Sequence, residues 1–302
     1  MDLNFFKQTR ILDGGMGQEL LARGMDSTGT LWSTKALIEP KYHKLIEDIH
    51  RDFVKSGAEI IVTATFTSRR IRLRENGIED QYEKLNKTAG EIAQKVKKDY
   101  QNIFIAGGLP PQYLTYEADT RPAKEIFENY NEQASILDPY IDFFYLDVLS
   151  SVNEIEIAIK AIKKFEKPYL IGAHISEGTK LPSGEKISDI VTKIKHEKLL
   201  GLILACISPE NYELNKEELK KIGVPFGFKV NGFITTKPKS GYTKSYKKSK
   251  SGNPNEFLGQ RKDLTPEKIK ELAKIFKEDG ATILGGCCEI KPSHIKEIAS
   301  LK

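Results

Sequence analysis

The sequence predicts an α/β fold, a single (β/α)8 TIM barrel whose active site lies at the C-terminal ends of the strands. Short apolar segments alternate with amphipathic helical segments along the chain, which is typical of a parallel sheet covered by helices. Eight strand segments occur in 302 residues, which favours a closed barrel over an open sheet. Because no Gly-x-Gly-x-x-Gly motif follows a strand segment, a dinucleotide-binding fold is disfavoured. We expect one domain over residues 1–302.

Each expected strand is a stretch of β-branched, aromatic and other apolar residues bounded by turn-forming residues. In chain order these strands cover residues 11–13, 60–65, 103–107, 143–149, 169–175, 202–206, 226–231 and 282–286. Between them, helical periodicity predicts helices, for example over residues 43–56, 81–98, 152–165 and 266–279. The last helix has clear end signals, because Thr265 can cap it, Pro266 takes its first position and Gly280 follows it.

Composition and charge exclude several classes of protein. Residues 1–10 lack the apolar core of a signal peptide, and no apolar run approaches the ~18 residues of a membrane span, so we expect a cytoplasmic protein. The net charge is +5, and six lysines between residues 237 and 250 follow one another without an intervening acid. No nucleic-acid-binding module accompanies them. We therefore expect small-molecule substrates and no nucleic-acid or membrane partner; the oligomeric state stays open.

The three cysteines point to a metal site. Cys287 and Cys288 follow two glycines at the end of the eighth expected strand, and Cys206 ends the sixth. In a barrel these strand ends share one face, so the three thiols are expected to meet there. Three sulfur ligands with one open tetrahedral position are typical of catalytic zinc. Three unrelated buried thiols are the alternative, and a vicinal disulfide is disfavoured because nothing indicates secretion.

Other strand ends bring polar groups to the same face. Asp13 ends the first strand and runs into Gly14-Gly15, whose backbone can approach a ligand closely or form a tight turn. Thr63 lies at the end of the second strand. Asp147 stands in the apolar run 143–149, where a carboxylate is costly to bury without a partner. We regard it as a stronger site candidate than the surface acids.

Three further features have two interpretations each. His174 at the fifth strand end fits either a site residue or a hydrogen-bonded structural imidazole. Trp32, the only tryptophan, fits the core or a ligand platform. Asn231 ends the seventh strand and opens a segment to residue 263. Because that segment exceeds ~12–15 residues and follows a strand end, we expect a lid over the active site, although a solvated charge run explains its lysines as well.

Four motifs resemble the homocysteine S-methyltransferase family and span nearly the whole chain. Residues 12–20, LDGGMGQEL, are similar to the family's opening L-D-G-G/A-M-G-T-E-L. Residues 63–66, TATF, resemble its T-N-T-F, and residues 105–108, IAGG, its third-strand A-G-S/G. Residues 285–295, which contain GGCC and PSHI, resemble its G-G-C-C-G-T-x-P-x-H-I ending. The resemblance implies a zinc-bearing, homocysteine-binding barrel that methylates homocysteine to methionine.

Residue by residue, the resemblance implies zinc ligation by the three cysteines. The implied substrate-binding residues are Asp13, Gly14, Gly15, Thr63, Asp147 and Asn231. Asp147 stands where the family usually has a Glu that binds the substrate ammonium, so the charge is kept on a shorter arm. Ala205 replaces an Asn, and Glu289 replaces the Gly after the cysteine pair, changes that affect the shape of the thiol pocket.

The chain is too short to carry cobalamin and folate domains beside a full barrel, so we expect a free onium donor. S-methylmethionine or S-adenosylmethionine is favoured; a betaine-like donor and a different small thiol acceptor are alternatives. Val148 follows Asp147 where betaine-using relatives have Tyr, which argues against a full aromatic cage. Trp32 and Phe66 are expected donor contacts. Because zinc activates the acceptor thiol, we expect no further catalytic residue.

Two other classes of protein remain open. In a zinc hydrolase of the TIM-barrel class, the open metal position would hold water, although such zinc usually has His and carboxylate ligands. In a zinc-stabilised binding protein without activity, a fourth protein ligand would close the metal site.

Overall fold

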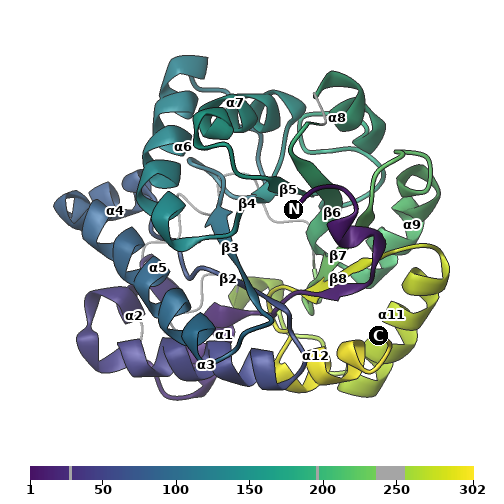
Figure 1. Ribbon diagram of the computed structural model, residues 1–302, viewed down its shortest axis with the longest axis horizontal. Helices are drawn as coiled ribbons and strands as arrows, with labels where there is room; N and C mark the ends of the chain where they lie inside the picture. The colour runs from purple at the N-terminus through teal and green to yellow at the C-terminus, as the bar shows by residue number, and fades with distance from the viewer. Residues whose placement is uncertain (27–28, 195–196, 236–255) are drawn as a thin grey trace.

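The computed structural model describes residues 1–26, 29–194, 197–235 and 256–302. Its eight parallel strands lie in the order β1-β8-β7-β6-β5-β4-β3-β2. Leu12 and Ile60 form a parallel bridge between the two ends of this series, and the Asp13 amide donates to the Ile60 carbonyl at 3.0 Å. The sheet thereby curls into a barrel with helices around it (Figure 1), which confirms the predicted fold class.

The strands are β1 (Arg10–Ile11), β2 (Ile60–Val62), β3 (Phe104–Leu109), β4 (Phe143–Leu149), β5 (Tyr169–Ala173), β6 (Leu199–Ile207), β7 (Phe226–Val230) and β8 (Ile283–Gly286). The helices are α1 (Met16–Ala22), α2 (Lys35–Ile38), α3 (His43–Lys55), α4 (Arg70–Glu75), α5 (Tyr82–Lys98), α6 (Ala123–Leu137), α7 (Val152–Ile162), α8 (Ile187–Lys193), α9 (Pro209–Leu219), α11 (Pro266–Glu278) and α12 (Pro292–Ala299). None of the helices within the described residues is both long and apolar enough to cross a membrane.

Most predicted elements lie within two or three residues of the observed ones, and the Thr265 hydroxyl caps α11 by accepting from the Lys268 amide. The first two strands are shorter than predicted. β2 ends at Val62 because the chain turns next, with the Thr65 amide donating to the Thr63 carbonyl at 2.7 Å. The helix predicted over 152–165 ends at Ile162 and continues as a 3-10 turn to Phe165.

The core has two layers. Apolar side chains fill the space between the barrel and its helices, and a smaller cluster fills the barrel itself. Phe6, which is fully buried, belongs to the inner cluster and packs edge-on against Phe143 at the start of β4. The N-terminal segment thus covers the end of the barrel where the strands begin, and its place over the barrel is visible in Figure 1. The opposite end holds the candidate site.

Two strands are bulged next to that site. In β4 the register to β5 shifts between Leu146 and Leu149, and in β6 the register to β7 shifts between Ala205 and Ile207. Each bulge contains a residue in the left-handed region, Val148 with φ 66° and Cys206 with φ 53°. A bulge changes the direction of the side chains around it and is frequent next to active sites.

Candidate active site

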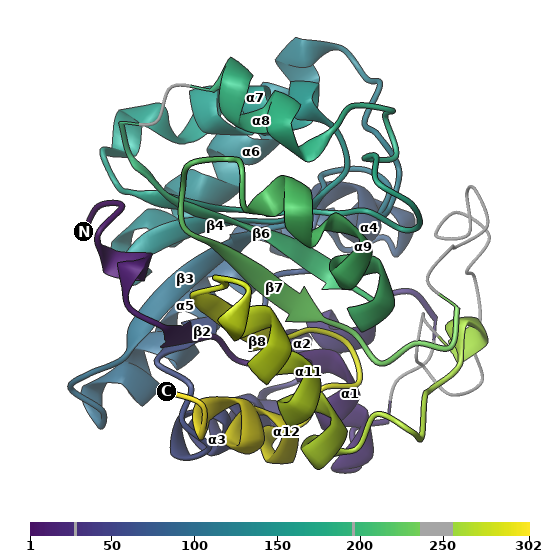
Figure 2. The same cartoon turned by 90° about the vertical axis from the view of Figure 1, so that its right-hand side faces the viewer.

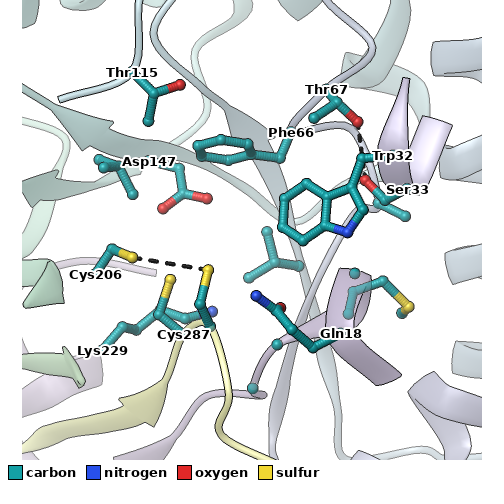
Figure 3. A pocket seen from close by; sticks show the side chains of 18 of the residues that line it. Gln18, Trp32, Ser33, Phe66, Thr67, Thr115, Asp147, Cys206, Lys229 and Cys287 are labelled. Atoms are coloured by element: carbon teal, nitrogen blue, oxygen red, sulfur yellow. Dashed lines mark hydrogen bonds between the residues drawn. The ribbon is translucent and has the colours of Figure 1, made fainter. Parts of the chain in front are cut away.

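A cavity opens at the C-terminal strand ends (Figure 3). Sulfur and carboxylate groups from β4, β6 and the segment after β8 line one half of it, together with Lys229 from β7. Residues of α1, the 3-10 turn Trp32–Thr34 and the segment after β2 line the other half. We call these the sulfur half and the aromatic half. The aromatic half contains Gln18, Trp32, Ser33, Phe66, Thr67, Arg69 and Arg72.

The three cysteines meet as the sequence predicts. The sulfur atoms of Cys206, Cys287 and Cys288 all lie within 4.8 Å of one another, and the Cys206–Cys288 distance is 3.9 Å. Two sulfurs on one tetrahedral zinc, each at about 2.3 Å from the metal, stand about 3.8 Å apart. All three thiols are free of disulfides. The donor set and its spacing therefore fit a metal held by three thiolates, with no fourth His, Asp or Glu in the cluster among the described residues.

Hydrogen bonds within the cluster favour one thiolate. The Tyr116 hydroxyl lies 3.0 Å from the Cys206 sulfur. Burial opposes ionisation, yet hydrogen bonds from Cys287, Cys288 and Tyr116 hold the pKa of the Cys206 thiol well below its usual range. The bonds to Cys206 raise the pKa of Cys287 and Cys288. Without a metal, the arrangement thus favours one thiolate, on Cys206, with Cys287 and Cys288 protonated.

Asp147 faces the sulfur cluster across the cavity (Figure 3), where the bulge of β4 directs it. Burial raises the pKa of its carboxyl to about 7, and the nearby Lys229 ammonium opposes that rise. A carboxylate in such surroundings gains from a cationic partner. Asp147 is therefore suited to bind an ammonium group.

Asp13 is already paired, which changes its expected role. Its Oδ1 accepts from the Lys229 ammonium at 2.8 Å and its Oδ2 from the Val62 amide at 2.8 Å. Asp13 and Lys229 are 3% and 5% exposed, so this is a buried ion pair. Lys229 was not among the residues that the sequence indicated. The sequence does contain an indication of Lys229, because a lysine inside the apolar strand Phe226–Val230 needs a buried acid as a partner.

Gly14 and Gly15 lie against the segment after β8. A Cβ atom on Gly14 would stand 2.3 Å from the Ile290 carbonyl oxygen, and one on Gly15 would stand 2.8 Å from the Cys287 carbonyl oxygen. Glycine is needed there so that the two loops can approach. Thr63 also lines the cavity, and its hydroxyl accepts from the Gly108 amide at 3.0 Å.

Two predicted candidates lie behind the cavity wall. Asn231 is 1% exposed, is absent from the lining residues and donates its amide to the Cys206 carbonyl at 2.6 Å. A substrate contact of Asn231 stays a prediction, and in this structure its side chain holds the bulge of β6. His174 bonds the Ala205 carbonyl at 3.1 Å and Ser176 at 2.8 Å, and its ring packs on Tyr116. Of its two interpretations, the structural imidazole is correct.

Trp32 and Phe66 both line the aromatic half. Trp32 is 6% exposed and belongs to a cluster with Tyr116, Cys206, Phe233 and Leu258. It therefore serves the core and the cavity wall together. The expected lid over 231–263 falls largely on residues 236–255, which lie outside the described residues; Phe233 and Leu258, near the two ends of this stretch, pack beside the site.

The family model for homocysteine S-methyltransferase matches residues 10–301. The chain belongs to the homocysteine S-methyltransferase family. A homocysteine S-methyltransferase of Escherichia coli is 24% identical over 311 residues, which cover 97% of this chain and 94% of that protein. Bovine betaine–homocysteine S-methyltransferase 1 is 26% identical over 299 residues, which cover 95% of this chain and 70% of that protein.

The family fold is also evident in solved structures. The homocysteine methyltransferase MmuM from Escherichia coli, in its metallated form, aligns with a TM-score of 0.79 at 21% identity and covers 98% of this chain and 96% of that chain. The residue after the cysteine pair departs from the pattern of the homocysteine S-methyltransferase family. Glu289, which replaces a Gly, adopts φ 66°, a conformation that glycine takes more readily.

Proposed function

We propose that this chain transfers a methyl group from a free onium donor to the thiol of L-homocysteine, giving methionine. Residues 1–302 act as one homocysteine-binding domain in this proposal. The observation that carries it is the cluster of Cys206, Cys287 and Cys288 opposite Asp147 in one cavity. A thiol acceptor that also bears an ammonium group has a partner at each end of this arrangement.

The reaction requires a thiolate. The acceptor sulfur gives up its proton to solvent and attacks the donor's methyl carbon with a lone pair. The bond between that methyl group and the donor's onium atom breaks, and its electron pair stays on the departing molecule, which leaves neutral. A zinc ion held by the three cysteines would supply the Lewis acidity that favours the acceptor thiolate near neutral pH. No protein side chain needs to accept a proton during the methyl transfer itself.

The chain's own residues do the positioning in this proposal. Asp147 binds the acceptor ammonium, while the Asp13–Lys229 pair keeps a second carboxylate from competing for it. Gly14 and Gly15, which line the cavity, let the loop after β1 pack against the segment after β8 that carries Cys287. Asn231 and Tyr116 fix Cys206 from its carbonyl and sulfur sides. Much of the acceleration would come from holding the sulfur and the methyl carbon in line.

The test is an assay of the purified, zinc-loaded protein with homocysteine and a panel of donors, scored by methionine formed. Cys206→Ala is expected to lose both bound zinc and activity, because it removes one of three ligands. A fully active Cys206→Ala protein would contradict the proposal. Hydrolysis of a substrate without homocysteine would favour a zinc hydrolase instead. A metal spectrum that shows four protein ligands, together with no methyl transfer, would favour a binding protein.

A further inference from the structure

Gln18 on α1 is a polar group of the cavity that the proposed chemistry has not used. It is 8% exposed and lines the aromatic half. Within the part of the chain that the structure describes, neither its Oε1 nor its Nε2 has a hydrogen-bond partner.

The Gln18 amide lies at the boundary between the two halves of the cavity. Figure 3 shows it directed into the space between Cys287 and Trp32. A Cβ atom on Gly15 would stand 3.2 Å from the Gln18 Oε1 and 2.8 Å from the Cys287 carbonyl oxygen. The amide therefore lies close to the sulfur half while its helix packs against the indole.

A buried amide without partners is costly, and side chains of this kind normally bond to protein, water or ligand. A second group in the aromatic half is in the same condition. The indole Nε1 of Trp32 is buried and has no hydrogen-bond partner among the described residues. The indole edge next to Nε1 packs on Gly17 of α1, so the Gln18 amide is the group that offers N–H donors and a carbonyl acceptor to whatever occupies this half.

A ligand that satisfies both the N–H donors and the carbonyl acceptor must carry a carboxylate and a cation with an N–H group. An α-amino-acid end has both, because its carboxylate accepts from N–H groups and its ammonium donates to a carbonyl. A betaine has a carboxylate, but its quaternary nitrogen has no N–H to donate to the Gln18 carbonyl. The acceptor's own ammonium is assigned to Asp147 on the opposite side, so Gln18 is available to the second substrate.

We infer that Gln18 makes this enzyme select a methyl donor with an α-amino-acid end, a sulfonium amino acid, over onium donors that carry a carboxylate alone. The inference rests on the proposed function and names its donor class. The family's opening motif has Thr where this chain has Gln18, so the determinant lies at a departure from that motif.

The decisive experiment compares two donors that differ only at the α-ammonium. S-methylmethionine and its deamino analogue, 4-(dimethylsulfonio)butanoate, carry the same sulfonium and the same chain length. The parent protein is expected to prefer S-methylmethionine by roughly 10- to 100-fold in kcat/KM, the size of one hydrogen bond to a charged group. Gln18→Leu, which has a similar volume and no polar atoms, should reduce that preference to about 1 by lowering kcat/KM for S-methylmethionine.

Two variants control the result. Gln18→Glu keeps an acceptor for the ammonium, so its preference for S-methylmethionine should survive even though repulsion of the carboxylate lowers kcat/KM for both donors. Gln101→Leu makes the same change at an exposed position before β3 and should alter nothing. Zinc content and far-UV circular dichroism show whether each variant is folded.

The outcomes separate the inference from the function beneath it. An unchanged donor preference in Gln18→Leu overturns the inference, and so does a rise in the homocysteine KM without a change in the donor KM. A parent protein that prefers betaine also overturns it. If the parent transfers methyl groups from no donor on the panel, the proposed function itself fails.

Discussion

Lys229 divides the roles of the two carboxylates in the cavity. In the proposed function, its pairing with Asp13 leaves Asp147 as the acid that binds the acceptor, although Asp13 follows β1, Asp147 lies within β4 and both line the same cavity. One carboxylate is thus structural and the other is assigned to substrate. This assignment makes Asp147 the residue whose charge can be tested most directly.

Asp147→Asn is expected to raise the homocysteine KM by roughly 10- to 100-fold, because a charge-assisted bond to the ammonium is lost. Zinc content should not change. Since burial raises the pKa of Asp147 to about 7, the parent's binding form declines as pH falls through 7. The homocysteine KM of the parent should therefore rise between pH 8 and 6, while that of the variant should not follow this trend.

Steady-state kinetics of both proteins across this range, with zinc measured in parallel, provide the check. Equal homocysteine KM values for parent and variant would remove Asp147 from the site.

The sequence could predict the cysteine cluster, since strand ends of a barrel converge and cysteine is rare in this chain. It could not indicate Tyr116, which reaches Cys206 from the loop after β3, where no periodicity fixes the direction of a side chain. Asn231 ended a strand like the others but points to a backbone carbonyl, a detail that depends on the bulge in β6. The sequence therefore indicated the type of metal ligand, but it did not indicate which side chains bond to those ligands.

At the scale of elements, α1 and the turn Trp32–Thr34 form the aromatic half by close packing. Gly17 in α1 lies under the indole, and a Cβ atom there would stand 2.2 Å from Trp32 Cζ2. Contact at that distance is not tolerated, so either the helix or the indole would have to move. Alanine would otherwise suit a helical position better than glycine.

Gly17→Ala is accordingly expected to displace Trp32 and to raise the donor KM several-fold, with less effect on the homocysteine KM. Tryptophan fluorescence reports the displacement directly, because the chain has one tryptophan. Asn153→Ala, at an exposed position of α7, provides a control for fluorescence and donor binding. An unchanged fluorescence spectrum and donor KM in Gly17→Ala would show that the indole does not contribute to donor binding.

Helix α7 carries an ionisable group with no role in the cavity. Glu154 is fully buried and accepts from the Tyr130 hydroxyl at 2.8 Å. Burial raises the pKa of its carboxyl to about 7. The folded protein therefore keeps a proton that the unfolded chain loses near pH 4.5, and stability falls as pH rises through 7. The difference reaches about 3 kcal/mol above that pH.

Glu154→Gln removes this titration and keeps an oxygen for the Tyr130 hydroxyl. We expect the variant to be more stable than the parent at pH 8 by up to about 3 kcal/mol and similar to it near pH 4.5. Urea unfolding at the two pH values, followed by circular dichroism, measures the difference. A stability difference that does not vary with pH would mean that Glu154 titrates normally.

The helix and strand boundaries were predicted best where end signals are local. Thr265 and Pro266 mark the start of α11 within the sequence itself. The ends of β1 and β2 depend instead on how the barrel closes at Leu12 and Ile60, a contact between distant parts of the chain. Sequence patterns thus gave the order of elements, and tertiary contacts set their lengths.

At the scale of the whole molecule, the barrel has its own core beneath the proposed metal site. The interior cluster, which includes Phe6, Phe143 and Ile203, involves none of the three cysteines. We expect removal of zinc by a chelator to abolish activity while the protein stays folded at 25 °C with a lower Tm, because metal binding adds stability only through linkage.

Far-UV circular dichroism and thermal unfolding before and after chelation test this expectation. Readdition of zinc should restore activity and Tm. Loss of secondary structure on chelation at 25 °C would mean that the metal is needed to hold the barrel together.

The left-handed conformations at Val148 and Cys206 affect how such a sequence can evolve. Residues with a Cβ atom are about 1–2 kcal/mol less favourable there than glycine. Glycine would relax the backbone at both positions, but it would also remove a buried side chain, since Val148 is 1% and Cys206 is 2% exposed. At position 148, loss of packing and relief of the backbone can be exchanged for one another while all three thiols are kept. At position 206 no such exchange is open to an active enzyme, because a glycine there removes a sulfur that the proposed reaction needs.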